Sequence, residues 1–122
     1  MKPTSLSWIL VPLAALLAGC SGGQSPSLGR TQVAFTSNRA GNSEIYVMET
    51  DGFNLRRLTF DDDFDFQPSL TPDRSTVVFT RRSGGDYQIW RIGTDGRNQR
   101  RLTPQAGLNA DPAVSPDGFR IA

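Results

Sequence analysis

The sequence predicts an all-β protein, a partial β-propeller of about two four-stranded antiparallel blades preceded by a signal peptide. Three observations favour this fold class. The segment DGFNLRRLT at 51–59 returns as DGRNQRRLT at 95–103, 44 positions later. A period of this length is typical of propeller blades and exceeds the common two-helix repeat of about 34 residues. The segments between turns are also rich in β-branched and aromatic residues and lack helical spacing.

The first predicted element is an export signal at residues 1–19. Lys2 precedes an apolar run of about 13 residues, which is shorter than the roughly 20 needed to span a membrane. The run ends in LAGC at 17–20, which resembles a bacterial lipobox, where the signal is cut before a cysteine that carries a lipid. Cys20 is the only cysteine and has no disulfide partner, so acylation explains it better than an ordinary secretory signal with an incidental cysteine.

Residues 20–31 are predicted to form the lipidated Cys20 and a flexible tether. The stretch SGGQSPSLGR after Cys20 is rich in glycine, serine and proline, a composition typical of a linker. By resemblance to the sorting pattern of such lipoproteins, Ser21 favours the outer membrane. We expect palmitate-type acyl chains on Cys20 to anchor the protein in the bacterial cell envelope, facing the periplasm.

Residues 32–122 are predicted to contain the repeated sheets. Positions 33–78 align with 77–122 without a gap, and about a third of the pairs are identical. One complete unit has an inner strand at 67–70, a second strand at 75–81, a third at 87–92 and an outermost strand in the RRLT segment. Leu58 and Leu102 should point into the packed layer. The paired arginines should keep an exposed edge charged, with an anion-binding row as the alternative.

Turn residues separate the predicted strands. In Pro-Asp turns, proline sets φ and aspartate bonds the following backbone. Asp-Gly pairs suit tight hairpins because the backbone there visits positive φ. We predict a structural role in these turns for Asp51, Gly52, Asp95, Gly96, Pro72, Asp73, Pro116, Asp117 and Gly118.

The segments VAFTSNRAGNSEIYVMETDGFNLRRLT at 33–59 and DPAVSPDGFRIA at 111–122 closely resemble the WD40-like (PD40) repeat of TolB-type propellers. The resemblance covers residues 32–122. It implies a propeller of about six blades that works in the periplasm as a protein-interaction platform. The sequence departs from the family pattern at Leu70 and Val114, where tryptophan is frequent, and at Arg74, which replaces the glycine of SPDG.

The number of predicted blades is too small for a closed ring. Closed propellers have about four to eight blades, and Val77, Phe79 and Val78 make a blade apolar on both faces. Two stacked blades would leave two such faces uncovered. We therefore expect a fragment of a longer propeller. The alternatives are self-association of copies through the exposed blade faces and a short, poorly ordered product.

The sequence predicts no catalytic, cofactor or metal site. The chain has no histidine, the commonest general base and metal ligand. The run FDDDFDF at 60–66 could gather a hard cation at Asp61, Asp62, Asp63 and Asp65, but a solvated loop between blades is the simpler interpretation. Its aromatic residues, Phe60, Phe64 and Phe66, are expected in the seam between blades, with contact to a partner as the alternative.

These features together predict a protein-binding function. A net charge near zero argues against nucleic acid as a partner. We expect a lipid-anchored envelope scaffold, not an enzyme, that binds unidentified envelope proteins through loops at 38–43, 60–67 and 82–86. The alternative is the N-terminal propeller portion of a larger exported enzyme, a serine peptidase like prolyl oligopeptidase, with its catalytic domain outside this chain.

Overall fold

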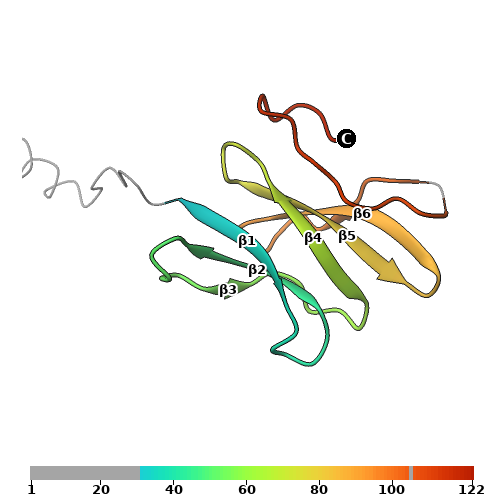
Figure 1. Ribbon diagram of the computed structural model, residues 1–122, viewed down its shortest axis with the longest axis horizontal. Helices are drawn as coiled ribbons and strands as arrows, with labels where there is room; N and C mark the ends of the chain where they lie inside the picture. Colours follow the sequence, from blue (N-terminus) through green and yellow to red (C-terminus); the bar gives the residue numbers. More distant parts are fainter. Residues whose placement is uncertain (1–30, 105) are drawn as a thin grey trace, which may run out of the picture. The chain divides into compact units, whose positions relative to one another are not determined.

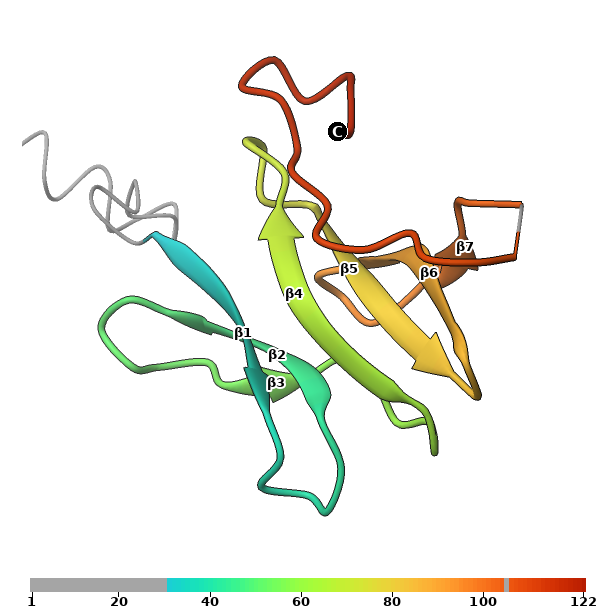
Figure 2. The same ribbon diagram turned by 45° about the vertical axis from the view of Figure 1, so that its right-hand side comes forward.

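The computed structural model describes residues 31–104 and 106–122 (Figure 1). The expected signal peptide, Cys20 and most of the tether lie outside these residues. The strands are β1 (Gln32–Ser37), β2 (Glu44–Glu49), β3 (Arg56–Arg57), β4 (Phe64–Leu70), β5 (Thr76–Ser83), β6 (Asp86–Gly93) and β7 (Arg100–Arg101). They form two antiparallel sheets, β1-β2-β3 and β4-β5-β6-β7, which confirms the predicted fold class (Figure 2).

The second sheet has the four strands, in sequence order, that the repeat predicts. Its inner strand β4 begins at Phe64 and is longer than predicted. The pairing of β4 with β5 shifts register between Phe66 and Ser69, where Gln67 has a φ of 52° and Pro68 has no N–H to donate. A bulge there lets the strand include a proline, and the strand begins at Phe64 and not at Gln67 as predicted.

The core lies between the two sheets. The first sheet contributes the buried Ile45, Val47 and Leu58, and the second contributes the buried Val77 and Phe79 among others. Alternation along a strand sends every second side chain to this seam, and each large apolar side chain buried there stabilises the fold by about 1.5–3 kcal/mol. Leu58 points inward as predicted.

The 44-residue period recurs in the backbone dihedral angles. Four pairs of residues 44 positions apart both adopt positive φ. The pairs are Gly52 and Gly96, Asn54 and Asn98, Gln67 and Asp111, and Arg74 and Gly118. Because positive φ is restrictive for residues with a Cβ, the matching angles show that the two units share their turns.

The Asp-Gly connections are longer than the tight hairpins that the sequence suggests. Strand β6 ends at Gly93 and β7 begins at Arg100. Gly96 adopts the positive φ of 84°, whereas Asp95 accepts a hydrogen bond from the Arg97 amide at 3.0 Å. Glycine supplies the backbone freedom and aspartate closes the loop through its side chain, so the turn spans more residues than the dipeptide.

The Pro-Asp turns hold their aspartates by hydrogen bonds. One carboxylate oxygen of Asp73 accepts from the Thr71 hydroxyl at 2.7 Å and from the Ser75 amide and hydroxyl at 3.0 and 2.8 Å. These bonds lower the pKa of Asp73 to about 2. Asp117 accepts from the Ser115 hydroxyl, which likewise lowers the pKa of Asp117. Both aspartates therefore stay ionised and order their turns.

The residues after β7 begin a further unit. Val114 and Ile121 form an antiparallel bridge, and the amides of Ala113 and Ala122 each donate to the other residue's carbonyl at 2.9 Å. The Val114 amide donates to Ser69 Oγ of β4 at 3.1 Å. Within residues 31–104 and 106–122, no helix is long and apolar enough to cross a membrane.

Candidate functional site

Three loops that are distant in sequence gather at one end of the sheets. They are 38–43 between β1 and β2, 60–67, which includes the first residues of β4, and 82–86, which includes the turn between β5 and β6 and the strand ends beside it; we call them the loop patch. The Asn42 side-chain amide donates to the carbonyls of Asp61 and Asp63 at 2.8 and 2.7 Å, which joins the first two loops. Phe64 lies opposite Arg82 in the β4–β5 pairing, which joins the second and third.

Two phenylalanines of the loop patch are exposed, contrary to the prediction that they lie in the seam. Phe60 is 70% exposed and Phe64 is 44% exposed. The Arg57 guanidinium lies 4.5 Å from the centre of the Phe60 ring, and that of Arg82 lies 5.3 Å from the Phe64 ring. Each ring therefore carries a cation on its face, which holds it in place at the surface.

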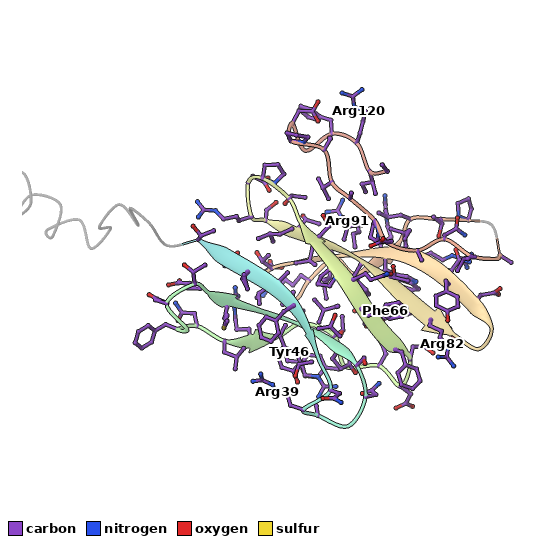
Figure 3. All side chains as sticks on the ribbon, in the orientation of Figure 1. Arg39, Tyr46, Phe66, Arg82, Arg91 and Arg120 are labelled. Carbon is purple, nitrogen blue, oxygen red and sulfur yellow. The ribbon has the colours of Figure 1, made fainter. Side chains whose placement is uncertain are left out.

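Strand alternation explains the misplaced phenylalanines. Phe64 and Phe66 share one face of β4, and Asp65 between them takes the face that is buried. Phe66 is half-buried and packs edge-on against Tyr87 of its own sheet, with ring centres 6.0 Å apart (Figure 3). The sequence could not show which face of β4 meets the first sheet.

A buried ion pair lies beneath the loop patch. Arg81 donates to both oxygens of Asp65, from Nε and from Nη2, at 2.7 Å each, and its Nη2 also pairs with Asp61. Asp65 is fully buried and Arg81 is 4% exposed. Burial raises the pKa of Asp65, and the hydrogen bonds from Arg81 act in the opposite direction. The acidic run is thus partly a structural element and not a solvated loop.

A second buried group comes from the repeated nonapeptide. The Thr59 hydroxyl accepts from the Ile45 amide at 2.9 Å and donates to the buried carboxylate of Glu44. Arg57 donates to the same carboxylate at 2.9 Å and to the Thr59 carbonyl at 2.7 Å. The second arginine and the threonine of RRLT therefore bind the neighbouring strand, whereas Arg56 is exposed as predicted for a charged edge.

The carboxylates of 60–66 do not assemble into a cation site in the part of the chain that the structure describes. No group of three or more potential metal ligands occurs among these residues. The carboxylates of Asp61 and Asp65 instead converge on Arg81. The predicted hard-cation alternative therefore has no structural support here.

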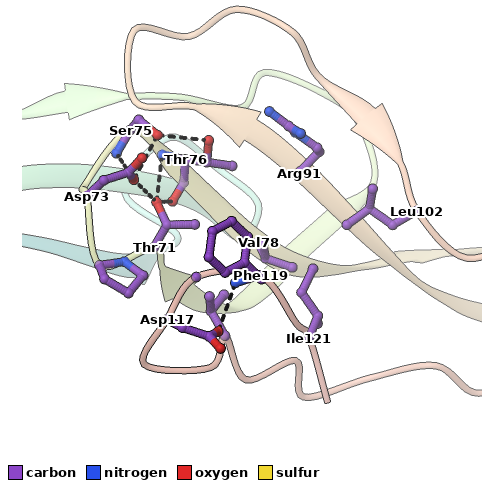
Figure 4. A pocket seen from close by; sticks show the side chains of 13 residues that line it. Thr71, Asp73, Ser75, Thr76, Val78, Arg91, Leu102, Asp117, Phe119 and Ile121 are labelled. Carbon is purple, nitrogen blue, oxygen red and sulfur yellow. Dashed lines mark hydrogen bonds between the residues drawn. The ribbon is translucent and has the colours of Figure 1, made fainter.

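A cavity of about 420 Å³ lies between the second sheet and the residues that begin the further unit (Figure 4). Its walls include Val78 and Arg91 from the sheet and Phe119 and Ile121 from residues 114–121. Phe119 is 89% exposed. The cavity borders the face of β5 that carries Val78, and Val78 is only 2% exposed, so this face is not left uncovered as the sequence predicts.

Comparisons with known proteins agree with this architecture. Residues 17–122 match the family model described as TolB beta propeller domain (PD40). The Tol-Pal system protein TolB of Geobacter sulfurreducens is 38% identical over 52 residues, which are 43% of this chain and 12% of that protein.

Two solved structures resemble the chain. A protein described as TolB from Agrobacterium tumefaciens gives a TM-score of 0.59 at 26% identity, over 71% of this chain and 35% of that chain. TolB from Acinetobacter baumannii gives 0.62 at 23% identity, over 74% and 23%. The second likeness shows the fold alone. In these three comparisons, this chain covers between 12% and 35% of the relative's length.

Proposed function

The chain belongs to the TolB β-propeller domain family, and from this premise we propose that it is a protein-interaction scaffold anchored by lipid in the bacterial cell envelope. Its partners would be envelope proteins. The similarity to a protein described as a Tol-Pal system component supports an envelope setting. No specific observation of the structure favours the peptidase alternative, and no reaction is proposed.

The loop patch is the observation that carries the proposal. Phe60 and Phe64 are exposed in the loop patch, and an arginine guanidinium stacks on one face of each ring. Aromatic residues and arginine are enriched among the residues that contribute most to protein–protein binding. The buried Arg81–Asp65 pair beneath them fixes the strand that carries Phe64. A rigid base lowers the entropy that the patch loses when a partner binds.

The proposed anchor is the acylated Cys20, which would place the protein at the outer membrane facing the periplasm. The LAGC motif and the linker composition of the tether support this proposal. More than one acyl chain at a single cysteine gives stable membrane binding, since each buried methylene contributes about 0.8 kcal/mol.

Capture of partners from envelope extract by the full chain tests the proposal. We expect the double variant Phe60→Ala/Phe64→Ala to recover on the order of tenfold less partner than the unchanged chain. The matched control is Phe53→Ala, because Phe53 is 69% exposed but lies in the β2–β3 loop, at the other end of β2. Equal loss in both variants, or capture of copies of this chain alone, would reject the loop patch as the partner site.

The anchor is tested in the same preparations. Labelled palmitate should enter the unchanged chain and not Cys20→Ser, and only the unchanged chain should sediment with membranes. Labelling that persists in Cys20→Ser would contradict the proposed anchor and leave the partner site unaffected.

A further inference from the structure

The loop between β2 and β3, residues 50–55, has two exposed apolar side chains. Phe53 is 69% exposed and Leu55 is 45% exposed. Phe60 and Phe64 of the loop patch each carry a guanidinium on one ring face. In the part of the chain that the structure describes, no cation or second ring stacks on Phe53. Phe53 therefore presents its ring to solvent without the cation that covers the other two.

Hydrogen bonds hold the backbone of this loop in place. The Glu49 amide donates to the Phe53 carbonyl at 2.9 Å, and the Phe53 amide donates to Asp51 Oδ1 at 3.0 Å. The Asn54 side-chain amide donates to Glu49 Oε1 at 2.7 Å. The apolar side chains thus stand on an ordered backbone, which lowers the entropy that the loop loses when a ligand covers them.

The equivalent loop of the second repeat is polar. Arg97 replaces Phe53 and Gln99 replaces Leu55. Every residue from 95 to 100 is exposed, although the first sheet packs against the second. A neighbouring sheet therefore does not cover a loop at this position of the repeat, and the fold does not require apolar side chains there.

The apolar loop lies at the end of the first sheet that follows the predicted tether (Figure 1). The Thr50 amide donates to the carbonyl of Thr31, the residue after the tether at 21–30. A linker of ten glycine-rich residues spans about 17 Å on average. The loop patch lies at the other end of β2, whose six residues rise about 20 Å. Phe53 is thus beside the residue at which the chain arrives from Cys20, whereas the loop patch is not.

We propose that Phe53 and Leu55 enter the interface of the membrane that carries the acylated Cys20. Phenylalanine and leucine side chains favour the boundary between lipid headgroups and acyl chains, while the polar residues beside them remain in water. Contact at this loop turns the loop patch away from the lipid surface and toward partners. The inference rests on the proposed lipid anchor and deepens it, because it names a second membrane contact and the orientation that this contact imposes.

A lipid surface fits this loop better than two other occupants. The chain's own apolar run at 6–18 is expected to leave with the signal peptide. In protein interfaces, arginine and aromatic residues dominate the binding energy and leucine is under-represented. The loop patch has the first combination, whereas this loop pairs a phenylalanine with a leucine and lies beside the tether.

Quenching by brominated lipid tests the contact. Cys20 is the only cysteine, so a maleimide phospholipid coupled to it holds the full chain on phosphatidylcholine vesicles whether or not cells acylate it. Trp8→Phe removes the tryptophan of the signal peptide, Phe53→Trp adds a reporter, and Trp90 supplies a constant background. Brominated phosphatidylcholine should lower the added fluorescence about twofold or more, since bromine quenches at contact and the ring lies among acyl-chain carbons.

Two matched variants complete the test. Phe60→Trp in place of Phe53→Trp is the control, because Phe60 is equally exposed but lies in the loop patch, and its quenching should be much weaker. Leu55→Gln in the reporter chain should weaken the quenching at position 53, and the second repeat shows that glutamine fits this loop. Phe53→Ala remains a control for partner capture, because a detergent extract offers no membrane surface.

Equal quenching at positions 53 and 60, or none at position 53, would overturn the inference. A blue-shifted emission of Phe53→Trp that does not change when vesicles are added would assign the loop to the chain's own residues 6–18. Loss of envelope partners in Phe53→Ala alone would assign it to a protein.

The anchor and the loop can fail separately. Quenching in the coupled chain, while Cys20 takes up no palmitate in cells, would reject the anchor and leave the affinity of the loop for lipid. Palmitate uptake without quenching at position 53 would reject this inference alone.

Discussion

The buried polar group of the first repeat is charged, whereas its equivalent in the second repeat is neutral. Glu44 binds Thr59 and Arg57 in the first. Gln88 takes the place of Glu44 in the second and accepts from the Thr103 hydroxyl. Both threonines accept from the amide of an isoleucine, at 2.9 and 3.0 Å. The two repeats therefore share the hydrogen bonds of the threonine that join their strands, whereas the charge of the buried side chain differs between them.

The charge of the buried side chain in each repeat depends on the groups that lie beside it. Glu44 lies near the Asp65–Arg81 pair, since its charge acts on the pKa of Asp65. Two carboxylates can be buried there because each has an arginine partner, Arg57 for Glu44 and Arg81 for Asp65. In the second repeat, Asn109 replaces Asp65 and Gln88 replaces Glu44. The Asn109 side-chain amide donates to Gln88 Oε1 at 3.5 Å. A neutral amide such as that of the buried Gln88 costs less to bury than a carboxylate.

The largest expected effect comes from breaking the buried ion pair between Asp65 and Arg81. Arg81→Met leaves Asp65 buried without a cation and should lower the free energy of unfolding by about 3–5 kcal/mol. Arg82→Met is the control. It removes a surface contact with Phe64 and should cost no more than about 1 kcal/mol. Urea denaturation of both variants measures the difference, and similar losses would show that burial of the pair is not the cause.

The loss in Arg81→Met should depend on pH. Without Arg81, burial raises the pKa of Asp65 further above its ordinary value of about 3.9. A carboxyl with a raised folded pKa favours the folded state below the unfolded pKa, and this stability disappears as the pH rises through the folded pKa. The deficit should therefore be smaller at pH 4 than at pH 7. A deficit that grows on acidification would contradict the assignment.

A smaller effect should distinguish the two threonines. Thr59→Val leaves the buried Glu44 carboxylate and the Ile45 amide without their shared partner, and should cost about 1–3 kcal/mol. Thr103 is half-buried, so water can replace its hydroxyl, and Thr103→Val should cost about 1 kcal/mol or less. The free energies of unfolding of the two valine variants test this directly. A larger loss at Thr103 would mean that burial does not set the cost.

The smallest effect concerns the two Pro-Asp turns. Arg74 has a φ of 63°, where a side chain is strained, whereas the second turn has Gly118 with a φ of 79°. Arg74→Gly should raise the free energy of unfolding by about 1 kcal/mol, and Gly118→Ala should lower it by about the same amount. Thermal melts of both variants measure the shifts. A loss of stability in Arg74→Gly would show that the arginine side chain stabilises its turn.

Much of the fold could be predicted because the signals are local. The 44-residue period, the Pro-Asp and Asp-Gly turns and the β-branched segments each lie within a few neighbouring residues, and they fixed the strand order of the second sheet. The ends of the strands could be predicted less well, because a bulge near Gln67 lets β4 include Pro68 and begin at Phe64. The loops of the patch were expected at the surface, but their contacts were not.

The sequence by itself determined the repeat, its turns and the inward position of Leu58, because chain geometry within one unit depends on adjacent residues. Only the tertiary structure decided that Asp65 is buried against Arg81 while Phe60 and Phe64 face solvent. The alternation of FDDDFDF allowed either face of β4 to meet the first sheet. The choice depended on which face found a buried cation, Arg81, and on Arg57 and Arg82, which cover the exposed rings.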